Sequence, residues 1–487
     1  MTLIGLAGIL GGLGLLIFLA FRGWSVLLLA PIAALIAALF SREPLLAHWT
    51  QTFMGGAAGF LGRFFPLFLL GAIFGKLMED SGSVTAIATF ITRQLASQRA
   101  MLAVVLAGAL VTYGGVSLFV AFFVLAPMAQ ELFRSANIPR RLMPAAIVLG
   151  TSTFTMSALP GTPSIQNAIP MPFFGTTPFA APGLGILASL IMVGFGLWWL
   201  SREERRARKR AEGFGVGAPM ATDRLATDEK LRERATTARE FDPAEILHGK
   251  RTDRPPPITA AALPLLVVIA VNLAMSLFIL PALDTRYLAD PPFGGVTLAD
   301  LGGVWAVITA LSCAIVTVLV VSHRRLPAIR ATMDAGANAA VLPALSVASL
   351  VGFGAVVAAM PAYAVVRDAV LSIGGGPLVS LAVATNSLAA LTGSASGGLT
   401  IALEALGPTY LERAVAIGLD PALLHRVAVI GSGTLDSLPH NGAVVTLLAV
   451  CGSTHRESYR DIVVVGIVGA MIALAVVVAV GSMFGSF

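Results

Sequence analysis

The sequence predicts an all-α polytopic membrane protein with about 10–14 transmembrane segments, arranged as two inverted-topology repeats with broken helices or re-entrant hairpins. Hydrophobic residues make up 56% of the 487 residues and charged residues only 12%, with a mean hydropathy of +0.86. Soluble domains carry about 25% charged residues. Polar, glycine-rich stretches interrupt the apolar runs, and some recur at a constant spacing. Composition therefore predicts the membrane class, and the interruptions predict the position of a site.

The N-terminal part contains two groups of apolar runs. Residues 2–21 and 24–40 come first, so we expect N-terminal transmembrane helices over residues 1–56. The first run has no basic n-region and no A-x-A-like cleavage site, and we expect it to be retained as a span rather than removed as a signal peptide. Residues 57–200, which end in a clear apolar span over 182–200, are the predicted first inverted repeat.

A charged segment over residues 201–257 divides the chain. It opens with the run REERRARKR and closes with three prolines, which is typical of a cytoplasmic linker, with lipid-headgroup binding as the alternative. This orientation places residues 281–295 outside the cell. The net charge of +6 is explained by such basic cytoplasmic loops. Nucleic-acid binding, the other explanation of a basic chain, would need a recognisable module, and the sequence shows none. Residues 258–335 are predicted connecting transmembrane helices, and residues 336–487 are the predicted second inverted repeat.

The two predicted repeats share residues at one spacing. Gly114 and Ser117 recur 279 positions later as Gly393 and Ser396 (393 − 114 = 279). The Leu-Pro pair that ends at Pro160 recurs at the same spacing in the second repeat. The basic loops give the two halves opposite orientations. Inverted repeats with broken helices at the membrane midplane are a transporter architecture.

Four polar segments break the helices of these repeats, at 113–117, 157–167, 392–398 and 431–442. Non-helical backbone at membrane depth survives only where it lines a protein-enclosed cavity. Glycine lets the backbone approach a ligand, proline ends helices, and half-helix N-termini attract a carboxylate. We therefore expect a small hydroxylated anion to bind here, with close helix packing as the alternative role of the Ser and Gly residues. The expected substrate-binding residues are Gly114, Ser117, Thr162, Ser164, Gln166, Asn167, Ser394, Ser396, His440 and Asn441.

Asp436 and His440 are the expected proton- or ion-coupling residues. Ionisable residues within membrane segments are costly and mark functional sites. The two lie four positions apart, so one helical turn would place them on one face. A cavity histidine can take up and release a proton near neutral pH; the alternative is a structural Asp–His pair that fixes the loop. By contrast, Lys76, Glu79 and Asp80 close an apolar run and are expected at the membrane interface.

Three long stretches resemble the gluconate permease (GntP-type) family, within a wider ion-transporter superfamily. They are residues 138–179 (IPRRLMPAAIVLGTSTFTMSALPGTPSIQNAIPMPFFGTTPF), 391–412 (LTGSASGGLTIALEALGPTYLE) and 425–462 (HRVAVIGSGTLDSLPHNGAVVTLLAVCGSTHRESYRDI). The likeness is greatest to the branch that includes 3-hydroxybutyrate permeases. It implies secondary active uptake of a small hydroxy- or sugar-derived carboxylate, with protons, across the bacterial inner membrane. The superfamily resemblance implies a homodimer, with a scaffold part and a moving transport part that holds two re-entrant hairpins.

Two departures from the family pattern shape the substrate prediction. Gluconate-specific members carry a His-Pro-Gly-Pro type loop where this chain reads LPGTPS, and some relatives carry Asp at the position of Ser157. The resemblance therefore favours a short hydroxy-monocarboxylate such as 3-hydroxybutyrate over gluconate, and it leaves coupling to Asp436 and His440 in the second half. Gluconate or another sugar acid, and coupling to sodium, are the alternatives.

Other function classes fit the residues less well. An intramembrane hydrolase would pair Ser394, Ser396 or Ser432 with His440. The sequence has no G-x-S-x-G elbow, however, and a hydrolase would not need the symmetry of the repeats. We therefore expect no enzyme, and no cofactor or metal site. A channel is the third class, and it would dissipate a gradient instead of concentrating a substrate.

Overall fold

The computed structural model is an assembly of helices that describes residues 2–22, 24–95, 99–215, 252, 254–439 and 441–487. No β-strand occurs over these ranges. Seven helical segments are long and apolar enough to cross a membrane, and three shorter apolar helices of 10–17 residues accompany them. The all-helical membrane class is therefore confirmed, and these segments together reach the lower end of the predicted number of spans.

Helix bounds in the N-terminal half follow the apolar runs. The helices are α1 (Thr2–Phe21), α2 (Val26–Ser41), α3 (Leu45–Ala47), the π-helix η1 (His48–Phe53), α4 (Met54–Asp80), α5 (Ser83–Leu95), α6 (Ala100–Tyr113), α7 (Leu118–Ser135), the 3-10 turn η3 (Arg140–Leu142), α8 (Met143–Thr151), α9 (Phe154–Ser157), α10 (Ile165–Ala168), α11 (Met171–Phe174) and α12 (Pro182–Lys209). The last of these continues from its apolar span into the basic run. Most of the predicted linker, residues 216–251 and 253, lies outside the described residues.

The C-terminal half resumes after the linker. Its helices are α15 (Ile258–Ala274), η5 (Met275–Ile279), α16 (Leu280–Ala282), η6 (Arg286–Ala289), η7 (Pro291–Phe293), α17 (Leu298–Ser322), η8 (His323–Arg325), α18 (Ile329–Ala339), α19 (Val341–Ala359), α20 (Tyr363–Leu371), α21 (Gly376–Thr392), α22 (Ala395–Ala416), α23 (Pro421–Thr434), α24 (Gly442–Val450), α25 (His455–Ile462), η9 (Val463–Val468) and α26 (Gly469–Phe484).

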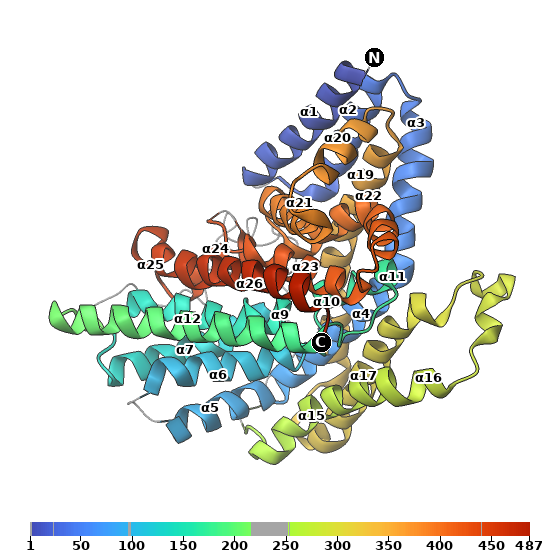
Figure 1. Ribbon diagram of the computed structural model, residues 1–487. Coiled ribbons are helices and arrows are strands. Elements are labelled where there is room, and N and C mark those ends of the chain that lie inside the picture. Colours follow the sequence, from blue (N-terminus) through green and yellow to red (C-terminus); the bar gives the residue numbers. More distant parts are fainter. Residues whose placement is uncertain (1, 23, 96–98, 216–251, 253, 440) are drawn as a thin grey trace.

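The long helix α4 connects the parts of the molecule (Figure 1). In that view α1, α2 and α20 form an upper arm, α5 to α7 with α12 and α26 form the main body, and α15 to α17 form a lower arm. Because α4 packs against α17, α18 and α19, its C-terminal turns reach the interior. Every residue of α4 from Ile73 to Asp80 is buried.

Helix ends in the two predicted repeats correspond at the spacing found in the sequence. α6 ends at Tyr113 and α21 ends at Thr392, 279 positions later (392 − 113 = 279). α6 packs on α7 and α8, and α21 packs in the same way on α22 and α23. Contacts between the halves are reciprocal, since α10 touches α22 and α24 touches α7. These relations support two related halves, and their opposite orientation stays a prediction.

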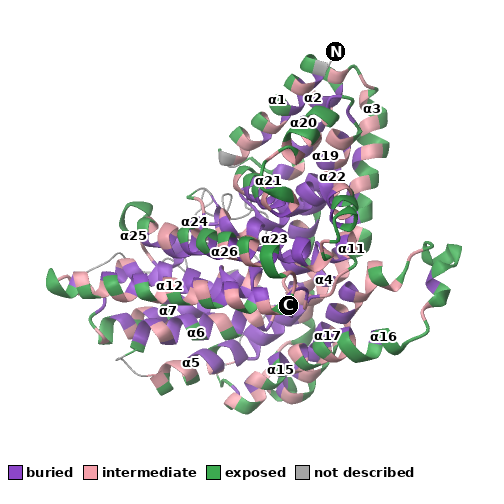
Figure 2. Ribbon diagram, viewed as in Figure 1, coloured by how far each residue is buried: buried purple, intermediate pink, exposed green. Residues whose placement is uncertain are grey.

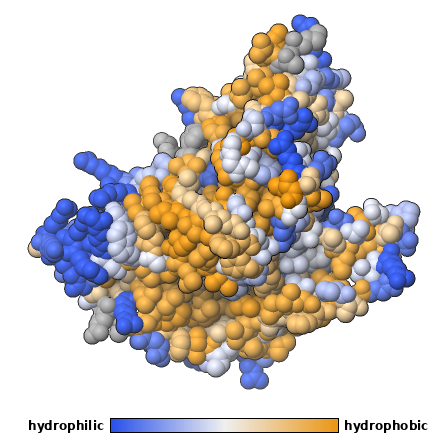
Figure 3. All heavy atoms as spheres, in the orientation of Figure 1, coloured by the Kyte–Doolittle hydropathy of each residue, from blue (hydrophilic) through white to orange (hydrophobic). Residues whose placement is uncertain are grey.

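Burial and hydropathy follow the pattern expected in a bilayer. Figure 2 shows buried residues concentrated in the main body around α6, α7 and α23, whereas α3 has no buried residue. Figure 3 shows hydrophobic residues over the face formed by α12 and α26, with hydrophilic residues along the upper arm and gathered at two ends of the rest of the molecule. One end is the basic terminus of α12, and the other is the loop between α16 and α17. The side of the membrane on which each region lies stays a prediction.

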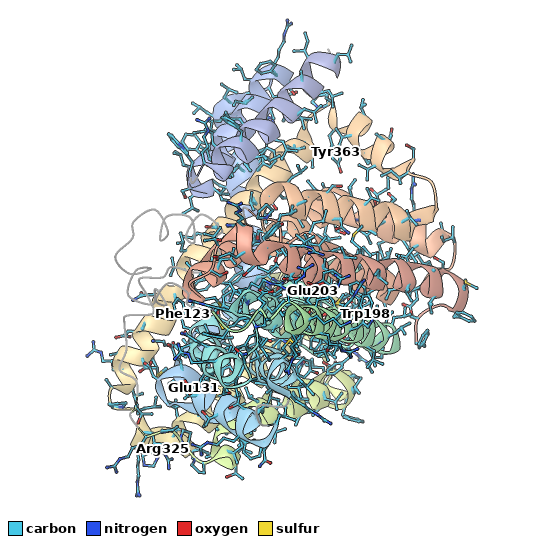
Figure 4. All side chains as sticks on the ribbon, turned by 90° about the vertical axis from the view of Figure 1, so that its left-hand side faces the viewer. Phe123, Glu131, Trp198, Glu203, Arg325 and Tyr363 are labelled. Atoms are coloured by element: carbon cyan, nitrogen blue, oxygen red, sulfur yellow. The ribbon has the colours of Figure 1, made fainter. Side chains whose placement is uncertain are left out.

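A cluster of ion pairs joins η3, α12 and α25 at one end of the body. Arg141 Nη1 lies 2.8 Å from Asp461 Oδ2, and Arg141 Nη2 lies 3.7 Å from Glu203 Oε2. In Figure 4 Glu203 lies within the helical body, whereas Arg325 lies at its edge. Asp461 and Glu203 are both buried, whereas Glu212, which also pairs with Arg141 at 2.9 Å, is not. The guanidinium therefore links these three segments by neutralising buried negative charge.

Candidate substrate site

A cavity of about 210 Å³ lies where the broken segments of the two repeats meet. Its walls come from α4, the break between α6 and α7, the residues before and within α10, the junction of α18 and α19, and the first turn of α22. Much of the lining is apolar. Its polar lining residues are Lys76, Glu79, Thr112, Ser117, Ser164, Gln166 and Ser396. The cavity therefore combines a mostly apolar wall with a few polar groups, which is typical of sites for small organic ligands.

The break between α6 and α7 presents Ser117 to the cavity. Gly115 has a φ of +93°, a conformation that L side chains rarely adopt, so the turn requires glycine here. Gly114 does not line the cavity. A Cβ atom at Gly114 would lie 2.2 Å from the side chain of Leu265 on α15. Gly114 therefore allows close helix packing, and Ser117 is the residue of this break that a ligand can reach.

Asn167 holds the segment around α10 in place. Its Nδ2 donates to the carbonyl oxygens of Thr162 and Pro178, both at 3.0 Å, and its Oδ1 lies 3.1 Å from His425 Nε2. Asn167 is fully buried and does not line the cavity. Its neighbour Gln166 lines the cavity and is 3% exposed, and no described residue makes a hydrogen bond to its amide group. The two adjacent amides therefore have different roles.

Asp436 and Asn441 join the two broken segments of the second repeat. Asp436 Oδ1 accepts hydrogen bonds from the Ala395 backbone N–H and from Asn441 Nδ2, both at 2.9 Å. The Asn441 amide also donates to the Gly393 carbonyl oxygen at 3.0 Å. Asp436 is half-buried and lies in a turn after α23, so the four-residue spacing to His440 does not place it on a helical face. Ser396, which follows Ala395, lines the cavity, so Asp436 contacts a segment of the cavity wall.

The structure divides the ten predicted substrate-binding residues into three groups. Those that line the cavity are Ser117, Ser164, Gln166 and Ser396. Those that lie outside its lining and support the broken segments are Gly114, Thr162, Asn167, Ser394 and Asn441. His440 lies outside the described residues, and so does any pairing with Asp436.

Side chains already occupy several of the N–H groups that the sequence offered to a carboxylate. At the start of α22, Ser394 Oγ accepts a hydrogen bond from the Gly397 N–H at 3.2 Å. At the start of α24, Asn441 Oδ1 accepts one from the Ala443 N–H at 2.8 Å. Such caps satisfy donors that have no partner within the helix. A bound anion must therefore find its main positive charge elsewhere on the cavity wall.

Lys76 and Glu79 line the cavity, although the sequence did not single them out as site residues. They were expected at the membrane interface, but they are only 7% and 5% exposed. The signal that could have found them is their spacing. Lys76, Glu79 and Asp80 lie at positions i, i+3 and i+4 of α4 and so share one helical face. A charged face inside an apolar helix indicates function.

Comparison with known proteins decides the family. Residues 2–172 match the family model described as GntP family permease. Over 476 residues the chain is 41% identical to the Bacillus subtilis (strain 168) protein named Uncharacterized transporter YxjC. The alignment covers 96% of this chain and 97% of that protein. The chain belongs to the GntP permease family. This GntP permease is a multi-pass membrane transporter of the gluconate permease type, and its relatives point to transport rather than to an enzyme.

Two further likenesses agree with this assignment. Over 122 residues the GntP permease is 30% identical to the High-affinity gluconate transporter of Escherichia coli (strain K12). The alignment covers 24% of this chain and 27% of that protein. The crystal structure of the Alcanivorax borkumensis YdaH transporter superposes with a TM-score of 0.52 over 90% of this chain and 89% of that chain, at 16% identity. The structural likeness shows the fold. Membership of the 3-hydroxybutyrate branch stays a prediction.

Proposed function

We propose that this GntP permease is a proton-coupled symporter that imports a small hydroxy-monocarboxylate, such as 3-hydroxybutyrate, across the bacterial inner membrane. The cavity of about 210 Å³ carries the proposal, because broken segments of both repeats wall it and place hydroxyl and amide groups on it. Pockets for drug-sized ligands measure roughly 300–1,000 Å³. A short acid therefore fits this cavity better than an extended one. Broken helices between repeats are where secondary transporters bind substrates.

Ser117 and Ser396 are the proposed hydroxyl contacts of the substrate carboxylate. They occupy equivalent positions of the two repeats (396 − 117 = 279), and both line the cavity. The amide of Gln166 is proposed to read the substrate hydroxyl, because it faces the cavity without a hydrogen-bond partner among the described residues. A site that offers hydrogen bonds to a substrate hydroxyl discriminates strongly against an analogue that lacks it.

Asp436 and His440 are proposed to carry the driving proton. Asp436 supports this role through its contact with Ala395, since the adjacent Ser396 lines the cavity and protonation would change the hydrogen bond that holds this wall. Histidine titrates in the physiological range. Sodium is the alternative coupling ion, because carboxylate and backbone oxygens also bind it in broken-helix sites.

The test is uptake of labelled 3-hydroxybutyrate into proteoliposomes, with pH and sodium gradients imposed separately and gluconate as competitor. Accumulation driven by the pH gradient and unaffected by gluconate supports the proposal. Inhibition by gluconate would favour the second candidate, a sugar-acid symporter, which the likeness to the high-affinity gluconate transporter motivates. Gradient-independent equilibration without accumulation would instead indicate a channel.

We further propose a homodimer in which residues 57–200 and 336–487 form the two inverted repeats. The N-terminal helices of residues 1–56 and the connecting helices of residues 258–335 would then complete the protomer around the transport part. Support comes from the matching helix ends and reciprocal contacts of the two halves. Multi-angle light scattering of the detergent-solubilised protein tests the dimer.

A further inference from the structure

The last turns of α4 carry a buried cluster of charges. Lys76 Nζ lies 3.3 Å from Glu79 Oε2 and 3.1 Å from Asp80 Oδ1. The side chains of the three residues are 8%, 3% and 0% exposed, respectively. Burying one ammonium and two carboxylates is expensive, and replacing such clusters by apolar residues is often neutral or stabilising. Stability alone therefore does not explain why these charges lie here.

The two carboxylates of the cluster have different surroundings. Asp80 Oδ2 accepts a hydrogen bond from Thr332 Oγ1 at 2.7 Å, and the Asp80 carbonyl oxygen accepts one from the Thr252 N–H at 3.0 Å. Asp80 does not line the cavity, whereas Lys76 and Glu79 do. Asp80 is therefore anchored behind the ammonium group by α18, and Glu79 lies on the side that a ligand can reach.

Another residue of the cavity wall, Gln166, also offers a hydrogen-bonding group to a ligand. Gln166 is only 3% exposed and lines the same cavity. Its side chain has no hydrogen-bond partner among the described residues. Its amide atoms are not among the fully buried side-chain atoms that lack a partner in the described part of the chain, so they open onto the cavity, where a bound molecule can reach them. Ser117 and Ser396 line the cavity beside these groups. A positive charge, two hydroxyls and an open amide therefore converge on one small volume.

We propose that Lys76 binds the carboxylate of the transported acid and that Glu79 is the counterion from which the ammonium turns when the acid binds. This assignment rests on the proposed function and deepens it, since it requires a substrate with one negative charge. The cavity offers no other described cation among its lining residues. An ammonium group is also a compact charge on a flexible stem, so it can exchange one carboxylate for another without moving the backbone.

The charges of the cluster predict opposite effects on acid binding when Glu79 is neutralised and when the Lys76 ammonium is removed. With one ammonium and two carboxylates, the cluster already satisfies Lys76, and an entering anion competes with Glu79 for the same donor. Glu79→Gln removes that competitor but leaves Asp80 to hold the ammonium, so the acid should bind more tightly. Loss of the ammonium should abolish the attraction. A cluster that served only for stability would weaken binding in both cases, or in neither.

The experiment measures the dissociation constants of 3-hydroxybutyrate and gluconate by isothermal titration calorimetry on the full-length protein in detergent. Glu79→Gln is expected to bind the acid roughly tenfold more tightly, because an opposing charge close to the site is gone. Lys76→Gln combined with Glu79→Gln is expected to bind about a hundredfold more weakly than wild type. The double variant is used because Lys76→Gln alone leaves two buried carboxylates uncompensated and can prevent folding.

Matched controls separate charge at the site from charge elsewhere. Lys209→Gln and Glu412→Gln change exposed residues of α12 and α22, and both should bind as wild type does. The uncharged methyl ester of 3-hydroxybutyrate should bind wild type and the double variant equally weakly. Each variant is first shown to elute as a single species and to unfold cooperatively.

The outcomes distinguish this inference from the proposed function. Tighter binding in Glu79→Gln together with loss in the folded double variant supports the assignment. Wild-type affinity in the folded double variant, or weaker binding in Glu79→Gln, overturns it while leaving the wild-type protein a carboxylate transporter. If wild type binds and transports neither acid, the proposed substrate class itself fails, and the role of Lys76 fails with it.

Discussion

Replacing Asp436 by asparagine separates a role in coupling from a role in holding the loops. Asparagine keeps an oxygen at the position that accepts hydrogen bonds from the Ala395 N–H and from Asn441 Nδ2, but it can neither carry a negative charge nor take up the driving proton. The substitution therefore preserves the shape of the site and removes its acid. Asp436→Ala removes the acceptor as well and is the matched comparison.

The expected stability changes follow from these two hydrogen bonds. A hydrogen bond to a charged group contributes about 1.5–3 kcal/mol and one between neutral groups about 0.5–1.5 kcal/mol. With two bonds at 2.9 Å, Asp436→Asn should lower the free energy of unfolding by about 2 kcal/mol. Asp436→Ala should lower it by up to about 6 kcal/mol, because two buried donors lose their acceptor at about 1–3 kcal/mol each.

The assay compares accumulation with exchange in proteoliposomes. Asp436→Asn should fail to concentrate labelled 3-hydroxybutyrate under an imposed pH gradient, yet it should still exchange internal for external substrate, since exchange needs no net proton movement. Asp284→Asn, an exposed aspartate, is the control and should behave as wild type. Wild-type accumulation by Asp436→Asn would refute the coupling role. Equal stability of the Asn and Ala variants would refute the calculation from hydrogen bonds.

Two further predictions concern packing and the amide pair. Gly398→Ala should lower the free energy of unfolding by about 1–3 kcal/mol, because the added Cβ would lie 2.2 Å from the Ala389 nitrogen and push α22 away from α21. The control Gly59→Ala, whose Cβ would have no neighbouring atom within 4 Å, should be neutral or stabilising. Thermal unfolding in detergent measures both. Asn167→Ala should destabilise the protein by about 2 kcal/mol or more through the lost side-chain hydrogen bonds to Thr162, Pro178 and His425. Gln166→Ala should leave stability within about 0.5 kcal/mol but weaken acid binding about tenfold; the reverse pattern would contradict the site.

The sequence was sufficient to place the helices and their interruptions. Hydrophobic runs of membrane length form helices because lipid leaves the backbone no other partner. Glycine and proline mark the ends, so α6 ends at Tyr113 and α21 at Thr392, next to Gly114 and Gly393. These are local effects. They do not depend on which distant segment packs against them, so a single chain read in order reveals them.

Side-chain roles within the interrupted segments were harder to predict. Gln166 and Asn167 are adjacent amides in one motif, yet one faces the cavity and the other holds the backbone of Thr162 and Pro178. Ser396 lines the cavity whereas Ser394 caps α22. Neighbouring residues in a turn point in different directions, and their direction depends on the path of the chain, which composition does not encode.

The sequence by itself determined the membrane class, the family resemblance, the broken segments and the equivalence of Ser117 and Ser396. Only the tertiary structure decided that these two serines share one cavity, that Asp436 joins two segments of the second repeat, and that Lys76 and Glu79 form part of the same wall. The physical reason is that burial of a charge depends on what packs around it. The sequence shows a charged face at the end of α4, and the packing of α18 and α19 against that helix turns it into the interior of a site.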